Sequence, residues 1–292
     1  MSSILVLVAA DDDKPLTEKH LEMAKSCFDT NFLLEKWLSP QKAVELYFES
    51  IPGAVERDKL EGLFVVDRID TFVVADDQRR KKKLLVSDMD NTMVIGETLD
   101  DLAEACGLKD KIAAITDRAM RGDFDFHRAL RIRVEMLKGL GESALQETCE
   151  RIQYMKGAET LVQTMRANGA KCVLVSGGFT SFTEPVAARL GFHENHGNVL
   201  DIEGGALTGK VCDPILDHQS KLELLQYYSS VYEIDPRDTM AVGDGANDLT
   251  MISSAGLGVG YHPKPYLRER ADNSVLYGDL TALLYVQGYS TF

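Results

Sequence analysis

The residues best suited to chemistry in this chain are Asp88 and Asp90, which follow the apolar residues 84–86. The apolar run predicts a short buried strand, so both aspartates stand just past its carboxyl end. Residues i and i+2 of an extended segment point to the same side, which would bring the two carboxyl groups into one small space. Ligands of open α/β sheets bind at this edge.

Two carboxylates held this close repel each other, which either raises the pKa of one of them or attracts a cation. Mg²⁺ takes carboxylate oxygens as ligands and keeps part of its shell for water and phosphate. An aspartate can attack phosphorus while its neighbour carries a proton. The stretch 88–92, Asp-Met-Asp-Asn-Thr, equally suits a polar turn with a helix N-cap, so the motif alone leaves both interpretations open.

A second candidate group lies at residues 243–248, Gly-Asp-Gly-Ala-Asn-Asp, directly after the apolar run 239–242. Asp244 could complete a Mg²⁺ site with Asp88, and Asn247 could donate a hydrogen bond to a substrate. The alternative is an Asp-Gly turn followed by a helix N-cap. Two strand ends that both carry aspartates make the turn interpretation the weaker one.

Two further residues give weaker signals. Ser176, followed by two glycines after the apolar run 172–175, could bind phosphate oxygens, although a strand followed by Gly-Gly usually marks a plain turn. Lys221, at the front of a helical segment, could neutralise the same phosphate, but a lone lysine is usually a solvated charge.

The elements that must position these residues fall into two units. Residues 1–78 predict a ferredoxin-like α+β unit with the order β-α-β-β-α-β, at 4–9, 17–27, 32–38, 43–48, 54–63 and 71–75. The next block predicts four helices, at 98–107 with Thr98 as its cap, 109–120, 126–138 and 143–154, with Gly122-Asp123 as a break. A helical insertion after the first core strand is expected to cover the active site.

From residue 157 onward the pattern alternates between helix and strand, as in a doubly wound α/β core. Helices are predicted at 158–167, 180–190 and 220–228, strands at 172–175, 239–242, 258–261 and 274–277, and a hairpin at 199–211.

Composition limits the kinds of partner. The chain has 292 residues, enough for two domains, and its 32 basic against 46 acidic residues give a net charge of −14, which disfavours nucleic acid. The basic run 79–83 is interpreted as a solvated linker. Five scattered cysteines predict reduced thiols in a cytoplasmic protein, and no apolar run is long enough to span a membrane.

Taken in order, these motifs resemble those of the haloacid dehalogenase superfamily of phosphotransferases over about residues 82–288. The four motifs are Asp88-x-Asp90-x-Thr92, Ser176, Lys221, and Gly243-Asp244-Gly245-x-Asn247-Asp248. The resemblance implies a Rossmann-like α/β core, with a helical cap at about 97–155, in a phosphatase domain at 79–292. An ACT-like α+β domain at 1–78 would precede it. Residues 97–100, Phe126 and residues 129–134 narrow the resemblance to phosphoserine phosphatases.

The family's roles carry over residue by residue. Asp88 would be the nucleophile and Asp90 the general acid and base, and Mg²⁺ would be held by the carboxylates of Asp88 and Asp244 and the backbone carbonyl of Asp90. Phosphate would be bound by Ser176, the Gly177 amide and Lys221, with Asn247 assisting and Asp248 orienting its neighbours. Glu97 would face the substrate ammonium and Arg133 its carboxylate.

The resemblance therefore implies a cytoplasmic, Mg²⁺-dependent phosphoserine phosphatase that releases L-serine and phosphate through an aspartyl-phosphate, as the last step of L-serine biosynthesis. Two alternatives remain: a related small-metabolite phosphatase or phosphotransferase, and a non-catalytic amino-acid sensor. The expected partner is the small molecule O-phosphoserine, with no nucleic acid and no membrane. The front domain is a candidate unit for homodimer formation.

Overall fold

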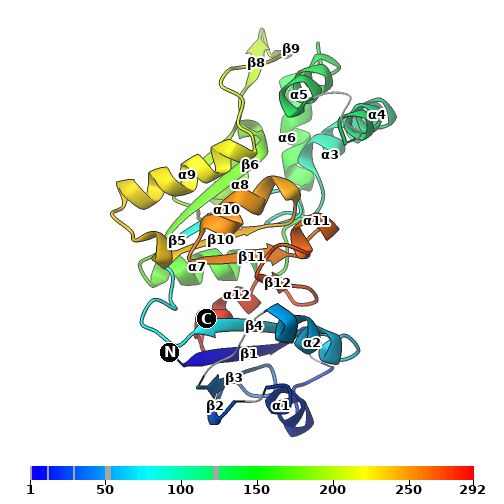
Figure 1. Cartoon of the computed structure of the whole chain (residues 1–292). Helices are drawn as coiled ribbons and strands as arrows, with labels where there is room; N and C mark the ends of the chain where they lie inside the picture. Colours follow the sequence, from blue (N-terminus) through cyan, green and yellow to red (C-terminus); the bar gives the residue numbers. More distant parts are fainter. Residues whose placement is uncertain (1, 12, 29, 50–53, 121–124) are drawn as a thin grey trace.

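The computed structural model describes residues 2–11, 13–28, 30–49, 54–120 and 125–292. The predicted break at Gly122-Asp123 lies outside these ranges. The chain forms an antiparallel unit, a parallel α/β core and a helical cap, placed one after another along a long axis (Figure 1). Within the described ranges, no helix combines the length and apolar character needed to cross a bilayer.

The first unit confirms the predicted order β-α-β-β-α-β. Its elements are β1 (Ser3–Ala9), α1 (Glu18–Lys25), β2 (Phe32–Ser39), β3 (Ala43–Phe48), α2 (Ala54–Phe64) and β4 (Ile69–Ala75). All strand pairs in its sheet are antiparallel, with the order β2-β3-β1-β4. Helix α1 begins after the predicted cap residue Thr17.

Alternation along β1 explains how the front unit is attached. Leu5 and Leu7 pack into the core beneath α1 and α2, whereas Ile4 and Val6 point the other way, into the main core of the chain. That main core includes residues of the C-terminal helix α12 (Ala282–Val286). The front unit therefore shares a hydrophobic core with the rest of the protein.

The α/β core is a six-stranded parallel sheet with the order β12-β11-β10-β5-β6-β7. Its strands are β5 (Leu84–Ser87), β6 (Lys171–Phe179), β7 (Glu194–Asn198), β10 (Thr239–Gly243), β11 (Leu257–Tyr261) and β12 (Asn273–Val275). Leu85 faces helix α7 (Ala158–Ala167), whereas Leu84 and Val86 face α9 (His218–Val231) and α10 (Leu249–Ser254). Both faces are covered, which explains the nearly continuous apolar strands.

The order of the sheet decides where the site lies. From β5 the chain moves to β6 and β7 on one side and later returns to β10 on the other side. The ends of β5 and β10 are therefore neighbours at a topological switch point, the usual ligand position in such sheets. A hydrogen bond from the Asp88 amide to the Val242 carbonyl, 2.9 Å long, joins the two strand ends.

The helical cap contains α3 (Thr98–Ala105), α4 (Lys109–Met120), α5 (Phe126–Glu135) and α6 (Glu142–Arg151). The hairpin of β8 (Leu200–Glu203) and β9 (Ala206–Val211) packs on it. Several predicted ends in the cap were wrong; α6, for example, ends at Arg151 and not at residue 154. Glu97, not Thr98, is the N-cap of α3, and α5 ends before residue 138, where Gly139 donates its amide to the Leu207 carbonyl of β9.

The interpretation of the basic run 79–83 as a solvated linker is wrong for Arg80. Its side chain is only 12% exposed, and its guanidinium lies 2.6 Å from the carboxylate of Glu45 on β3, whose side chain is fully buried. The same group donates to the Val286 carbonyl of α12 at 2.8 Å. The basic run thus joins the front unit to the end of the chain.

Replacing Arg80 with alanine is expected to lower the free energy of unfolding by about 3 kcal/mol, because Glu45 would lose its main cationic partner while remaining buried. Urea unfolding followed by circular dichroism measures the change. Arg79→Ala is the matched control, since the Arg79 side chain is 38% exposed and its buried partner Asp238 would keep a second cation, Lys83. Equal losses in the two variants would contradict the assignment.

Candidate active site

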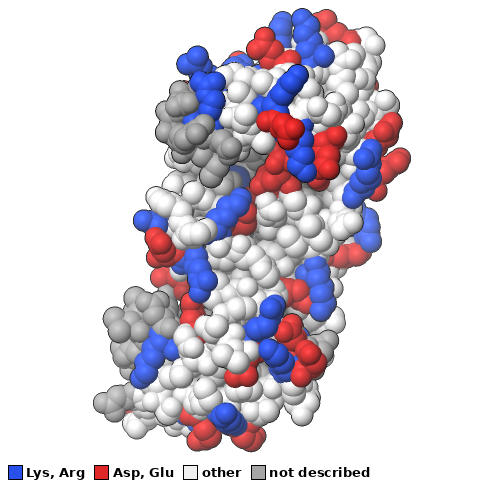
Figure 2. All heavy atoms as spheres, turned by 90° about the vertical axis from the view of Figure 1, so that its right-hand side faces the viewer, with Lys and Arg blue, Asp and Glu red and all other residues white. Residues whose placement is uncertain are grey.

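The predicted site residues meet in one cavity of about 420 Å³ between the core and the cap. Asp88 and Asp244 reach it from the ends of β5 and β10, and Ser176 reaches it from β6. Its lining includes Asp88, Asp90, Glu97, Arg133, Ser176, Gly177, Asp244 and Asn247, together with Phe126 and Lys264. Figure 2 shows acidic side chains gathered in the upper half of the molecule, around a recess. Lys221 is not part of the lining but contacts Asp88 from within the core.

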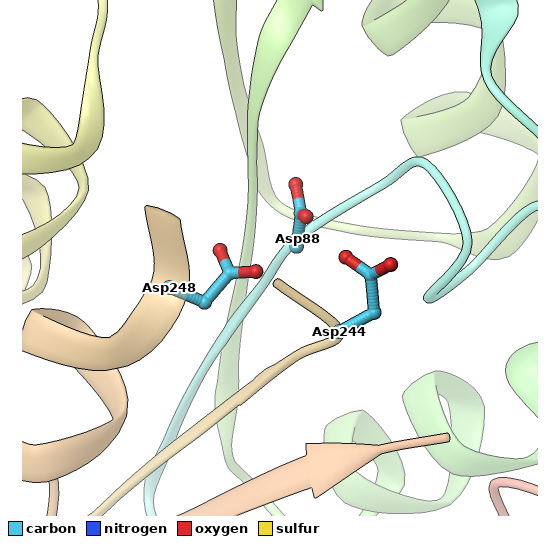
Figure 3. A group of neighbouring side chains, drawn as sticks. All are labelled: Asp88, Asp244 and Asp248. Carbon is cyan, nitrogen blue, oxygen red and sulfur yellow. The ribbon is translucent and has the colours of Figure 1, made fainter. Parts of the chain in front are cut away.

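Two carboxylates of the cavity wall, those of Asp88 and Asp244, lie next to a third that is buried beneath the wall, Asp248. Oxygens of Asp88, Asp244 and Asp248 lie within 4.8 Å of one another. Figure 3 shows Asp88 reaching this space from one segment, and Asp244 and Asp248 reaching it from the turn between β10 and α10. Lys221, itself 1% exposed, bridges two of them, with its Nζ 2.7 Å from Asp88 Oδ1 and 2.6 Å from Asp248 Oδ1. The helix α9 that carries Lys221 is capped by Asp217, which accepts hydrogen bonds from the first amides of the helix.

Burial and like charge control the ionisation of this cluster. Burial raises the pKa of Asp88 well above its usual value, and the negative charge of Asp248 raises it further against the opposing effect of Lys221. Burial also raises the pKa of Asp244. Burial acts to lower the pKa of Lys221, but Asp248 and Asp88 outweigh it, so Lys221 stays protonated. An added cation would stabilise the carboxylate forms, and clustered carboxylate oxygens suit a hard divalent ion.

The Asp90 side chain is engaged away from that cluster. Its Oδ1 accepts a 2.9 Å hydrogen bond from the Thr98 amide at the start of α3, and its Oδ2 accepts one of 3.2 Å from the Ser176 hydroxyl. Burial raises the pKa of Asp90, whereas these two donors act to lower it. A buried carboxyl with a raised pKa is suited to give and take a proton.

Strand β6 holds the Ser176 turn closely against Asp90. The strand continues beyond the predicted residue 175 to Phe179, and the Gly178 amide donates to Ser176 Oγ at 2.8 Å. A Cβ atom on Gly178 would lie 3.0 Å from Ser176 Oγ and 3.2 Å from Asp90 Oδ2. Glycine is therefore needed here for close approach, and Asn198 fixes the Gly177 carbonyl with a 2.9 Å hydrogen bond.

An anion and a cation occupy the cap side of the cavity. Glu97 accepts a 2.7 Å hydrogen bond from the Asn91 side chain, and burial, followed by the charge of Asp90, raises its pKa to about 7. Arg133 on α5 is half-buried; burial lowers its pKa, and Asp100 and Glu97 oppose that effect. The pair offers opposite charges to a zwitterionic ligand.

Lys264 is a site residue that sequence reasoning missed. Its Nζ lies 3.0 Å from Asp244 Oδ2 and 3.6 Å from Glu97 Oε1, and it lines the cavity. Burial acts to lower the pKa of Lys264, but the two carboxylates raise it overall. The available signal was its position just after β11, since strand ends of a parallel sheet meet at one edge.

Residues 85–253 match the family of haloacid dehalogenase-like hydrolases. The chain is 44% identical over 208 residues to a phosphoserine phosphatase of Albidiferax ferrireducens, an alignment that covers 69% of this chain and 88% of the relative. It is 42% identical over 209 residues to phosphoserine phosphatase SerB2 of Mycobacterium tuberculosis, which covers 72% of this chain and 51% of that protein. The chain spans 51%, 64% and 60% of the phosphoserine phosphatases of Mycobacterium tuberculosis, Haemophilus influenzae and Archaeoglobus fulgidus, between half and two thirds of each relative.

Solved structures extend the likeness to the front unit. A HAD family hydrolase from Salmonella enterica serovar Typhi has a TM-score of 0.87 at 26% identity and covers 98% of both chains. A probable phosphoserine phosphatase from Vibrio cholerae has a TM-score of 0.81 at 29% identity, and the alignment covers 99% of this chain and 87% of the Vibrio cholerae chain. The combination of an antiparallel unit with the α/β core therefore recurs in these proteins.

Proposed function

This chain belongs to the family of haloacid dehalogenase-like hydrolases, and from that premise we propose that it hydrolyses O-phospho-L-serine to L-serine and phosphate, the last step of L-serine biosynthesis. The observation that carries the proposal is the composition of one cavity. Its base holds aspartates suited to phosphoryl transfer, and its cap side holds Glu97 and Arg133, the charges that would match an ammonium and a carboxylate. Relatives named phosphoserine phosphatase support the same substrate.

The family implies a divalent cation, and the donor set fits one, because the carboxylates of Asp88 and Asp244 offer oxygens within 4.8 Å of each other, with Asp248 adding negative charge beside them. We propose Mg²⁺, held by the carboxylates of Asp88 and Asp244 and the backbone carbonyl of Asp90. When bound, it would withdraw charge from the phosphate oxygens and keep Asp88 ionised.

In the proposed reaction an oxygen of Asp88 attacks phosphorus, and the bond from phosphorus to the seryl oxygen breaks. Asp90 gives its proton to that oxygen, which leaves as the hydroxyl of serine. Asp90 then takes a proton from a water molecule whose oxygen attacks the phosphorus of the aspartyl-phosphate. Phosphate leaves, and the Asp88 carboxylate is restored.

The remaining residues would hold the phosphate in line for this attack. Ser176, the Gly177 amide and Asn247 line the cavity beside Asp88 and would donate to phosphate oxygens. Lys221, which lies in the core behind Asp88, would neutralise negative charge of the phosphate. Its Nζ is held by Asp248 Oδ1 at 2.6 Å. Phosphoryl transfer depends mainly on such positioning and charge stabilisation.

Phosphate release from O-phospho-L-serine, phosphohomoserine, phosphothreonine and a sugar phosphate, each with Mg²⁺ and with EDTA, tests the proposal. We expect a clear preference for O-phospho-L-serine that is lost in EDTA. Activity strongest on a substrate without a carboxylate would favour a different small-metabolite phosphatase. Binding of phosphoserine without Mg²⁺-dependent phosphate release would favour the sensor.

The raised pKa of Glu97 predicts a pH dependence. Because that pKa is about 7, Glu97 becomes neutral as the pH falls through 7 and no longer offers an anion to the substrate ammonium. We expect kcat/KM for O-phospho-L-serine to fall by about tenfold per pH unit on the acid side of this value. Glu97→Gln should have lower activity at neutral pH, and its kcat/KM should no longer fall with pH in this range. If the fall persists in that variant, a different group is responsible for it.

We further propose that residues 1–78 form an ACT-like domain, residues 79–292 the phosphatase domain, and that the front domain mediates a homodimer. Edge strand β2 supports a second copy as its partner, since Phe32, Leu33 and Leu34 expose 39%, 52% and 54% of their surface.

The five free cysteines support a cytoplasmic location.

The full chain is expected to have the mass of a dimer in light scattering, and Leu33→Asp with Leu34→Asp is expected to reduce it to that of a monomer, because the charges would oppose pairing of the two edges. Val199→Asp, at a similarly exposed apolar residue near the cap, is the matched control. A monomeric parent chain, or a dimer that survives both substitutions, would exclude this interface.

A further inference from the structure

A carboxylate of the front unit reaches into the catalytic core. Asp70 on β4 is 1% exposed, and its Oδ1 accepts the amides of Leu276 and Tyr277 at 2.7 and 3.0 Å. Its Oδ2 accepts the Gly278 amide at 2.7 Å. A Cβ atom on Gly278 would lie 2.7 Å from that oxygen, so a side chain at residue 278 would not fit against the buried carboxylate. Asp70 thus fixes the loop after β12.

That loop is joined to the segment after β11. The Gly278 carbonyl accepts a 2.8 Å hydrogen bond from His262 Nε2, and the His262 amide donates to the Val275 carbonyl at 2.8 Å. His262 has a φ of 41°, a conformation that a side-chain-bearing residue keeps only where its surroundings hold it. The Asp70 loop therefore helps to hold His262.

Two residues beyond His262, Lys264 reaches the catalytic cavity. Its backbone amide donates to the Asp244 carbonyl at 2.8 Å, and its Nζ lies 3.0 Å from Asp244 Oδ2 and 3.6 Å from Glu97 Oε1. A groove of about 630 Å³ follows this route, and its wall includes Ala10 and Asp11 of the front unit as well as His262 and Lys264. The front unit and the catalytic cavity are thus connected by an unbroken series of contacts.

Lys264 has a separate electrostatic task from Lys221. Lys221 is buried and engaged by Asp88 and Asp248, whereas Lys264 is the cation that contacts Asp244 and Glu97. Its charge at Asp244 opposes a divalent cation on that carboxylate. The same charge favours a phosphorylated, anionic substrate in the cavity. Lys264 therefore acts in opposite directions on the two ligands.

We propose that Asp70 is a positioning residue through which the front unit holds Lys264 between Asp244 and Glu97, and so sets the balance between cation binding and substrate binding. The substrate half of this inference rests on the proposed function, whereas the cation half does not. Neither residue is assigned a chemical step.

Lys264→Met should shift the two affinities in opposite directions. Calorimetric titration of the full chain with Mn²⁺ or Mg²⁺, without substrate, is expected to show about fivefold tighter binding, while KM for O-phospho-L-serine rises about fivefold. These changes are modest because the Lys264 side chain is 55% exposed and partly screened by solvent. Asp70→Asn should also tighten cation binding and raise KM, as Lys264→Met does, but by a smaller factor. The side-chain amide of asparagine would face the Gly278 amide, and the loop would loosen.

The double variant separates a shared route from two independent effects. If Asp70 acts through Lys264, Asp70→Asn adds nothing to Lys264→Met in either measurement. Glu45→Gln is the control for the seam between the two units, because it disturbs the Arg80 contact without touching the Asp70 loop. Lys156→Met is the control for charge, because Lys156 lines the same groove but pairs with Asp279. Both controls should leave cation affinity unchanged.

Several outcomes would overturn the inference. These are an Asp70→Asn protein with unchanged cation affinity and KM, additive effects in the double variant, or equal shifts in Glu45→Gln. If Asp70→Asn does not fold, His262→Ala breaks the same route within the core and should reproduce its shifts. A chain that binds cations as expected but releases no phosphate from phosphoserine would reject the proposed function and leave the cation half standing.

Discussion

Replacing Asp88 with asparagine is expected to reduce Mg²⁺-dependent phosphate release from O-phospho-L-serine by at least about 10⁴-fold, because an amide cannot serve as the nucleophile that forms the aspartyl-phosphate. The substitution at residue 88 tests the chemical role of the carboxylate and not its shape. Asp88 lies 2.7 Å from Lys221 and lines the cavity at the end of β5, and asparagine preserves its shape. The measurement is a single-turnover assay of phosphate release, with the protein in excess over the substrate and at a saturating concentration.

The fold of the Asp88→Asn protein must be checked alongside its activity. Removing one negative charge relieves repulsion with Asp248 and Asp244, so we expect the thermal midpoint to change little even though Lys221 loses a partner. Asp201→Asn, in the hairpin strand β8, is the matched control and should keep full activity. Full turnover in the Asp88→Asn protein would reject the covalent mechanism while leaving the fold assignment intact.

The sequence predicted at which edge of the sheet the candidate site residues meet, because the residues that follow a strand are close to it in the sequence. Apolar runs followed within two residues by Asp88, Ser176 and Asp244 identified three strands, and parallel strands bring their carboxyl ends to one edge. The order β-α-β-β-α-β of the front unit was also confirmed, since each of its strands carries a clear apolar pattern. In these regions the pattern of neighbouring residues carries the information.

Elements with weak local patterns were missed. Strand β7 reads Glu-Asn-His-Gly-Asn and lies at the edge of the sheet, where its pairing with β6 and not its own side chains makes it extended. Helices α10 and α12, of six and five residues, are too short to show a helical period. Their form depends on packing against the sheet, which a single sequence does not display.

Contacts between distant segments were also beyond local patterns. Arg80 looked like part of a solvated run because its partner Glu45 lies in another unit. Lys264 was not singled out because its contact with Asp244 exists only after β10 and β11 are paired. The grouping of Asp248 with Asp88 and Asp244, in place of the Asp90 side chain, likewise depends on the turn that starts α10.

Replacing Arg133 with alanine is expected to lower kcat/KM for O-phospho-L-serine by about 10³-fold, because the substrate carboxylate would lose its cation and remain near the negative charges of Glu97 and Asp100. Phosphoethanolamine has the same ammonium and phosphate but no carboxylate, so its turnover should change by less than about threefold. The ratio of the two rates measures how much of the specificity comes from Arg133.

The control for this comparison is Arg151→Ala, which removes an exposed arginine of the cap that pairs with Glu147 on the same helix. It should leave both rates unchanged. An equal loss for both substrates in Arg133→Ala would mean that the arginine supports the cap and not the carboxylate, since Arg133 Nε also contacts the Ala129 carbonyl of α5. A selective loss would instead link the serine preference to one side chain of the cap, while the aspartates of the core perform the chemistry. Substrate choice and phosphoryl transfer would then lie on separate elements, which explains how one catalytic edge can serve different substrates through changes in the cap.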